Sequence, residues 1–396
     1  MATLVSARRA LLVLGLATAG AMATAVTASA AAQPATGDIQ AAGGATAIGN
    51  SYIVTLRDGV SNVDAAAHRL ANRYGGTIRQ TYETALHGFE VSIGEKAARR
   101  LAADRAVSVV EQNHTISLAA TQANPPSWGL DRIDQRNLPL DRSYTFPNTA
   151  SNVHAYIIDT GIRFSHRTFG GRATSGFDAI DGGRADDCNG HGTHVAGTVG
   201  GAEFGVAKRV QLVAVRVLDC RGGGSVGSVV AGINWVTRNA IKPAVANMSL
   251  GGGPSASIDA AVNRSISAGV TYAIAAGNSN ANACNFSPAR VPAAITVGAT
   301  DRTDRRASFS NFGRCLDIFG PGVAIVSSVN TSDTATASFS GTSMATPHVT
   351  GAAALVLQAH PGFTPTQVRN QLVADATTAH VIGAGTGSPN RLLFVH

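Results

Sequence analysis

The segment VHAYIIDTG, residues 153–161, decides the fold class, because it is a short apolar run that ends in a carboxylate and a glycine. Runs of this kind recur through the second half of the chain, and helix-like segments lie between several of them. The strand-like runs cover residues 153–158, 210–218, 244–250, 270–276 and 294–297, and the helix-like segments cover residues 227–238, 258–268 and 351–360. Strands that alternate with helices predict an α/β fold with a mostly parallel sheet flanked by helices.

Three polar side chains stand at the ends of such elements. Asp159 ends the first of the strand-like runs, His191 opens a Gly-rich and apolar helix in NGHGTHVAG, and Ser343 opens another helix in GTSMATPH. Pro347 is compatible with the last placement, because proline is tolerated near a helix N-terminus. Strand ends on one side of a parallel sheet gather such groups into one crevice. We therefore expect the three side chains to meet.

The combination of a serine, a histidine and an aspartate suits nucleophilic catalysis. A serine hydroxyl is a poor nucleophile at neutral pH and needs a base within hydrogen-bond reach. A histidine can take the proton, and a buried carboxylate fixes the histidine tautomer. The order Asp, His, Ser is one of three chain orders in which this geometry recurs. The helix N-terminus at Ser343 and the amide of Asn278, which ends the run AAGN, can stabilise an oxyanion.

Two other site chemistries fit these motifs less well. His191 and His194 are three residues apart with no glutamate between them, so the HExxH zinc signature is absent. Residues 222–227 match the GxGxxG spacing of a nucleotide-binding oxidoreductase, but residues 242–250, where that signature needs an acidic residue, contain none. Such an oxidoreductase and a catalytically inactive binding protein are the alternatives to a hydrolase.

Together the motifs resemble those of the subtilisin-like serine proteases, the subtilases, and within them the proteinase K branch and its aqualysin-type members. The motifs are DTG at 159–161, GHGTHVAG at 190–197, AGN at 276–278 and GTSMATPH at 341–348, and the similarity continues through WGLDRIDQ at 128–135, SFSNFG at 308–313 and GSPNRLL at 387–393. The resemblance covers nearly all of residues 120–396. It implies a subtilisin-like fold and a broad endopeptidase of protein and peptide substrates, with apolar or aromatic residues preferred before the cut.

The resemblance also implies a role for each matching residue. Asp159 would orient the base, His191 would be the general base and then the general acid, and Ser343 would be the nucleophile that forms an acyl-enzyme. Asn278 and the Ser343 backbone N–H would form the oxyanion hole. The substrate would lie extended between two backbone edges and over an apolar pocket, which correspond to Gly222, Gly223 and Gly224, to Ser249, Leu250 and Gly251, and to Ala276 and Gly277.

Residues 1–30 are typical of a secretory signal peptide. Arg8 and Arg9 precede an apolar stretch, and ASA at residues 28–30 supplies a small-residue cleavage site. We therefore expect a secreted protein with no membrane attachment once the signal is removed.

Residues 52–118 have the order β-α-β-β-α-β of a split-βαβ, ferredoxin-like module, in which Asn62 can cap the first helix and Gly75 lies past its end. The module is similar to the inhibitory propeptide of the subtilases. We expect residues 31–119 to be a propeptide that assists folding, inhibits the enzyme and is cut off by the enzyme itself between Ala119 and Ala120. Residues 120–396 would then be the catalytic domain.

The four cysteines are Cys188, Cys220, Cys284 and Cys315. An even number in an exported chain favours two disulfides, and the sequence permits three pairings. Loop closure weakly favours neighbours. The resemblance implies the pairs Cys188–Cys220 and Cys284–Cys315.

The resemblance further implies structural calcium and no organic cofactor. One site would combine the Pro292 and Ala294 carbonyls with Asp317, and the second would use Asp131, Asp134 and Gln135. Calcium prefers such sets of carboxylate, carbonyl and amide oxygens.

The net charge of +7 does not indicate a nucleic-acid partner, because no basic run after residue 30 is longer than a pair. We expect a mildly basic, monomeric enzyme whose partners are its substrates and its own propeptide.

Overall fold

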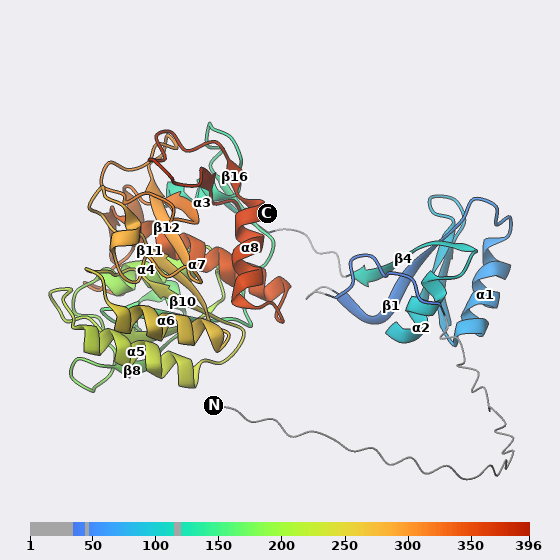
Figure 1. Ribbon diagram of the computed structural model, residues 1–396, viewed down its shortest axis with the longest axis horizontal. Coiled ribbons are helices and arrows are strands. Elements are labelled where there is room, and N and C mark those ends of the chain that lie inside the picture. Colours follow the sequence, from blue (N-terminus) through green and yellow to red (C-terminus); the bar gives the residue numbers. More distant parts are fainter. Residues whose placement is uncertain (1–34, 44–46, 115–119) are drawn as a thin grey trace, which may run out of the picture.

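The computed structural model describes residues 35–43, 47–114 and 120–396, which form two folded parts (Figure 1). The expected signal peptide and Ala119 lie outside the described residues. Each part has a hydrophobic core of its own: one core draws its buried residues from positions 39–110 and the others from positions 130–395. Among the described residues, no helix is both long enough and apolar enough to cross a membrane.

The small part has the element order that the sequence predicts. It comprises β1 (Ala47–Leu56), α1 (Val63–Tyr74), β2 (Thr77–Tyr82), β3 (Gly88–Ser92), α2 (Glu95–Ala102) and β4 (Val107–His114). The strands form an antiparallel sheet in the order β2-β3-β1-β4. Asn62 caps α1 by accepting a hydrogen bond from Ala65 N at 2.8 Å, and Gly75 ends the helix at φ 78°, as expected.

The large part is built on a nine-stranded sheet in the order β16-β17-β13-β12-β11-β10-β7-β9-β8. All neighbours in this sheet are parallel except β16 and β17. The predicted parallel α/β sheet is therefore confirmed. The strands are β7 (His154–Asp159), β8 (Ala173–Asp178), β9 (Gln211–Arg216), β10 (Ala244–Met248), β11 (Thr271–Ala275), β12 (Ile295–Thr300), β13 (Ile318–Pro321), β16 (Thr377–Thr378) and β17 (Arg391–Leu392).

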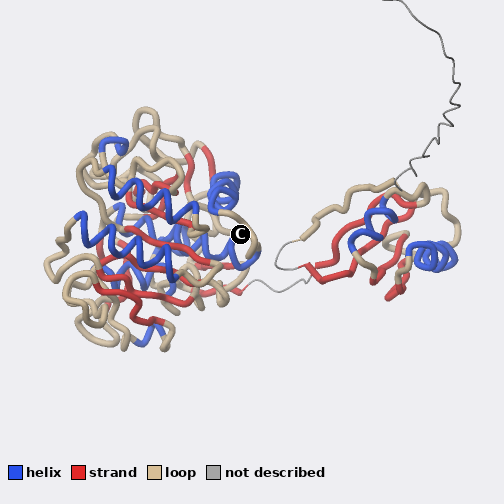
Figure 2. The backbone as a smooth tube through the Cα atoms, turned by 60° about the horizontal axis from the view of Figure 1, so that its bottom comes forward, coloured by secondary structure: helices blue, strands red, loops and turns tan. Residues whose placement is uncertain are grey.

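Helices lie along both faces of this sheet (Figure 2). They are α3 (Trp128–Ile133), α4 (His191–Gly200), α5 (Val226–Asn239), α6 (Ala256–Ser267), α7 (Thr342–Ala359) and α8 (Pro365–Asp375). Short 3₁₀ turns and two antiparallel pairs of strands complete the part: η1 (Arg167–Phe169), η2 (Ala283–Asn285), β5 (Ala120–Ala123) with β6 (Ser143–Phe146), and β14 (Ile325–Ser328) with β15 (Thr336–Phe339).

The side chains of β7 show how the two helical layers are held. Ala155 and Ile157 join the core that contains α4 and α7, whereas Tyr156 and Ile158 join the core that contains α5 and α6. Successive residues of a strand point to opposite faces, so an unbroken apolar run is what a strand buried on both faces requires. This is why the segment at 153–161 indicates the fold.

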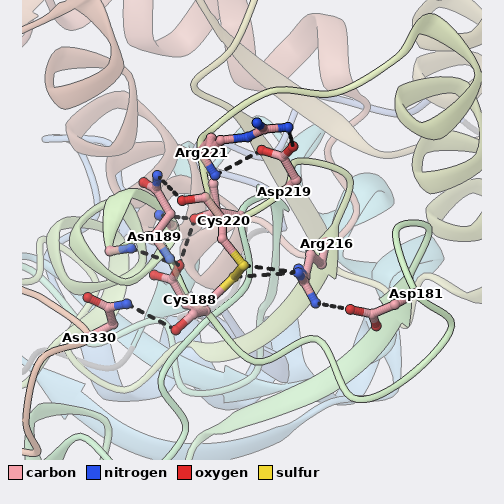
Figure 3. Close-up of a disulfide and its surroundings, with 12 residues drawn as sticks. Asp181, Cys188, Asn189, Arg216, Asp219, Cys220, Arg221 and Asn330 are labelled. Atoms are coloured by element: carbon pink, nitrogen blue, oxygen red, sulfur yellow. Dashed lines mark hydrogen bonds and ion pairs between the residues drawn. A yellow bond between two sulfur atoms is a disulfide. The ribbon is translucent and has the colours of Figure 1, made fainter.

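Both expected disulfides are present, Cys188–Cys220 and Cys284–Cys315. The first joins the loop before α4 to the loop after β9. Figure 3 shows Arg216 beside it, with Nη2 at 3.5 Å from Cys188 Sγ and Nη1 at 2.9 Å from Asp181 Oδ2. Each bridge closes a loop of about 30 residues, which on the chain-entropy model stabilises the fold by about 3–4 kcal/mol.

We expect the double substitution Cys284→Ser/Cys315→Ser to lower the free energy of unfolding by about 3–4 kcal/mol, because the unfolded chain regains loop freedom. Urea denaturation of the full-length protein in a Ser343→Ala background, which removes the expected nucleophile, measures this loss. An unchanged midpoint and slope would contradict it.

Candidate active site

Asp159 and His191 meet where β7 ends and α4 begins. His191 Nδ1 lies 2.7 Å from Asp159 Oδ1. The Asp159 side chain is fully buried, whereas 27% of the His191 side chain is exposed. Burial lowers the pKa of His191, but the Asp159 carboxylate and the charge of Asp187 outweigh it, so the pKa is raised above its usual value.

The backbone brings the start of α4 against the end of β7. A Cβ on Gly192 would lie 2.2 Å from the Gly161 carbonyl oxygen, a separation that atoms cannot adopt. Gly192 N also donates to Thr160 Oγ1 at 2.9 Å. The glycine after His191 is therefore required for the histidine to reach the carboxylate.

Asp187 organises the turn before His191, a role that the sequence reasoning missed. Its Oδ1 accepts hydrogen bonds from Thr160 Oγ1 at 2.9 Å, Asn189 N at 2.9 Å and Gly190 N at 2.8 Å. Its Oδ2 accepts one from Thr193 N at 2.9 Å. An acidic residue shortly before a Gly-rich helix start, as in DCNGH, is the signal that indicates such an N-terminal cap.

Ser343 lies in the first turn of α7, beside the end of β10. Its Oγ donates to the Ser249 carbonyl at 3.1 Å, and Ser249 Oγ donates to the Ser343 carbonyl at 2.8 Å. The two serines thus hold each other in place.

Asn278 and Ser343 present two N–H donors to one region. Asn278 Oδ1 accepts from Thr342 N at 2.8 Å and from Thr342 Oγ1 at 2.9 Å, which fixes the amide orientation. Both nitrogens lie near Gly341. A Cβ atom added to this glycine would be 3.5 Å from Asn278 Nδ2 and 3.6 Å from Ser343 N. An anionic oxygen placed near these two nitrogens would find both as donors.

Two adjoining cavities hold the expected substrate-binding residues. The first, of about 570 Å³, is lined by His191 and by the two expected edges, Gly222–Gly224 and Ser249–Gly251. The second, of about 350 Å³, is lined by Ala276, Gly277, Asn278 and Ser343. Both share Leu250, Gly251, Gly252, Gly253 and Ser287, so they form one continuous cleft. Phe286 and Ala289, which the sequence reasoning missed, complete the wall of the second cavity.

The other two histidines of the motifs are buried in the core. His194 Nε2 lies 3.0 Å from the Ile325 carbonyl oxygen, and His348 Nδ1 lies 2.9 Å from the Met344 carbonyl oxygen. Burial lowers the pKa of each to about 4. Both rings are therefore neutral at physiological pH.

The two expected calcium sites differ in the hydrogen bonds that their carboxylate oxygens already accept. Asp317 Oδ1 accepts from Arg369 Nε at 2.9 Å and also from Arg369 Nη2, and Asp317 Oδ2 accepts from Thr296 N at 2.8 Å. The guanidinium of Arg369 thus occupies Oδ1 of the carboxylate that the expected site would combine with the Pro292 and Ala294 carbonyls. These residues do not fit a calcium site.

The second expected site fits a cation. Asp134 Oδ1 is buried without a partner, while Asp131 and Gln135 accept only backbone N–H groups of residues 141 and 142. Burial raises the pKa of Asp134 to about 6, with further contributions from Asp141 and Asp131. A bound cation would relieve both the burial and the repulsion. In the described part of the chain no three acidic, histidine or cysteine side chains are grouped as a metal site, so carbonyl and amide oxygens would have to contribute.

Residues 151–392 match the family model described as the Subtilase family. The chain belongs to the subtilases. It is 56% identical over 333 residues to the extracellular serine proteinase of Thermus sp. (strain Rt41A), across 84% of this chain and 81% of that protein. It is 48% identical over 332 residues to the alkaline serine exoprotease A of Vibrio alginolyticus, across 82% of this chain and 62% of that protein.

Among solved structures, this subtilase is similar to a cold-adapted subtilisin-like serine proteinase, with 53% identity and a TM-score of 0.67. The match covers 68% of this chain and 98% of the other. The family and the fold inferred from the motifs are thereby confirmed. This subtilase is a secreted serine endopeptidase that acts on protein substrates.

We expect Asp187→Asn to lower the pKa of His191, because the charge of Asp187 helps to raise it. An NMR titration of the His191 ring in the full-length Ser343→Ala protein measures the shift. Asp186→Asn is the matched control, since Asp186 is 60% exposed and pairs with Arg184 at 3.7 Å. Equal His191 pKa values in both variants would disprove the role of Asp187.

Proposed function

We propose that this subtilase cleaves peptide bonds with Ser343 as the nucleophile, His191 as the general base and Asp159 as the residue that orients His191. The observation that carries the proposal is the 2.7 Å contact between Asp159 Oδ1 and His191 Nδ1. With Nδ1–H donated to a buried carboxylate, Nε2 is the nitrogen that can accept a proton from the cleft.

The reaction begins when the Ser343 hydroxyl turns from the Ser249 carbonyl toward His191. Oγ attacks the substrate carbonyl carbon while its proton passes to His191 Nε2. The oxyanion that forms is stabilised by Asn278 Nδ2 and Ser343 N. The C–N bond then breaks as His191 returns the proton to the leaving amine, and a water molecule hydrolyses the acyl-enzyme by the same steps with His191 again as the base.

The substrate is held mainly through its backbone. We propose that it lies extended between Gly222–Gly224 and Ser249–Gly251, which line the first cavity, and adds a strand to these edges. The residue before the cut enters the second cavity, whose wall includes Ala275, Ala276 and Phe286. This lining favours apolar or aromatic side chains and otherwise permits broad specificity.

The small part is proposed to be a propeptide within residues 31–119. Its core draws its buried residues from positions 39–110, separately from the cores of the large part, so its removal leaves the catalytic cores intact. The enzyme would cleave between Ala119 and Ala120 and act as a monomer. Asp131, Asp134 and Gln135 would hold a structural calcium ion, which neutralises the buried carboxylates.

We expect Ser343→Ala to abolish peptide hydrolysis and autoprocessing together, with a fall in kcat of about 10⁶-fold, the magnitude known from subtilisin. Intact mass, N-terminal sequencing and labelling by a serine-directed fluorophosphonate test this. Wild type should begin near residue 120 and carry one label, and the variant should be untrimmed and unlabelled. A variant that is still trimmed in a protease-free host would refute autoprocessing, and an unlabelled, folded wild type would favour a binding protein.

We expect Asn278→Ala to lower kcat by about 10²–10³-fold with little change in KM, again a magnitude known from subtilisin, because the donor acts in the transition state. Steady-state kinetics on a peptide substrate measures the two constants separately. Asn239→Ala, at the end of α5, is the control for a surface asparagine. An increase in KM at constant kcat would contradict the oxyanion role.

A further inference from the structure

Arg369 on α8 makes a close ion pair with Asp317, the residue directly before β13. Nε and Nη2 both donate to Asp317 Oδ1, with the Nε contact at 2.9 Å. The Asp317 side chain is only 8% exposed and that of Arg369 is 33% exposed. The pair is thus a partly buried, charge-assisted interaction rather than a surface contact.

Both oxygens of the same carboxylate already accept hydrogen bonds, and both lone pairs of Oδ1 are used by the guanidinium. Calcium takes six to eight oxygens at about 2.3–2.6 Å, and the expected ligand set offers it one carboxylate, that of Asp317. Oδ1 accepts the hydrogen bonds of the guanidinium. Oδ2 accepts a hydrogen bond from Thr296 N at 2.8 Å, which joins the start of β12 to the start of β13.

The charge balance also opposes a divalent ion. Burial raises the pKa of Asp317 above its usual value, although Arg369 and Arg391 both act electrostatically to lower it. The positive charges of two arginines therefore already act on one carboxylate, and Arg369 is in direct contact with it. A calcium ion would add two positive charges beside them, at a cost that one carboxylate and a few carbonyl dipoles do not offset.

We propose that the guanidinium of Arg369 takes the place of a calcium ion at Asp317. It would thereby hold α8 to the starts of β12 and β13 without a metal. The guanidinium does for the carboxylate what the ion would do: it neutralises the buried charge and joins it to a neighbouring element. Because it is covalently attached, its contribution does not depend on the calcium concentration.

Calcium binding to the full-length Ser343→Ala protein tests the proposal, with calcium chloride titrated in a calorimeter. We expect Arg369→Ala to bind one more calcium ion than its parent, with a dissociation constant of about 10⁻⁴–10⁻³ M, the range of extracellular calcium modules. Adding Asp317→Asn should remove the gained ion, whereas Asp317→Asn alone should leave the parental number unchanged. Arg369→Lys, which keeps the charge, should gain none.

Two results would overturn the proposal. If Asp317→Asn alone lowers the number of calcium ions that the parent protein binds, then the parent binds calcium at Asp317 despite Arg369. An Arg369→Ala protein that folds but gains no ion shows that the guanidinium is not what excludes calcium.

Thermal unfolding gives a second readout. The midpoint of Arg369→Ala should fall in EDTA and be restored by millimolar calcium beyond any calcium effect seen in the parent. Arg290→Ala is the matched control, because Arg290 pairs with Asp259 at 2.6 Å in a similarly half-buried setting. Its midpoint should fall without such additional rescue, and equal rescue of both variants would count against the proposal.

Discussion

The hydrogen bond between the buried carboxylate of Asp159 and the ring of His191 is the contact on which the site depends. A charged group without solvent is costly unless hydrogen bonds compensate it. Asp159 Oδ1 receives them from His191 and from Thr160 N at 2.8 Å, while Oδ2 is buried without a partner. The fold provides this environment at the end of a strand that is covered on both faces. The parallel sheet and the two helical layers are therefore the conditions under which such a carboxylate can exist.

Parallel strands also explain why the remaining groups gather at one edge. Asp159 ends β7, Ser249 follows β10, and the run that leads to Asn278 follows β11, while α4 and α7 begin at the same edge. Each group is placed by the end of a rigid element rather than by a long loop. The cleft is accordingly lined by backbone and by small side chains, which suits a substrate recognised through its own backbone.

The parallel sheet, the order of elements in the small part and the placement of the four proposed site residues at element boundaries could be predicted from the sequence. Each leaves a local pattern: an unbroken apolar run, a cap, or a motif at an element boundary. The sequence did not reveal the strands β8 and β13 or the helix α8, whose apolar runs are short and depend on tertiary packing. Nor did it reveal the pair of Asp317 and Arg369, which lie 52 residues apart. Ion pairs between distant elements follow from three-dimensional packing and leave no periodic signal.

The close approach of Gly192 to the Gly161 carbonyl affects how accurately the start of α4 is placed against the end of β7. Backbone, not a side chain, sets the distance between helix and strand at this point, so rotamer changes cannot alter it. The backbone of His191 can therefore move away from the end of β7 only if the sheet itself bends or the helix slides along it. The precision with which the backbone of His191 is placed is then limited by the stiffness of the central strands, and a substitution far out in the sheet can disturb it without touching the cleft.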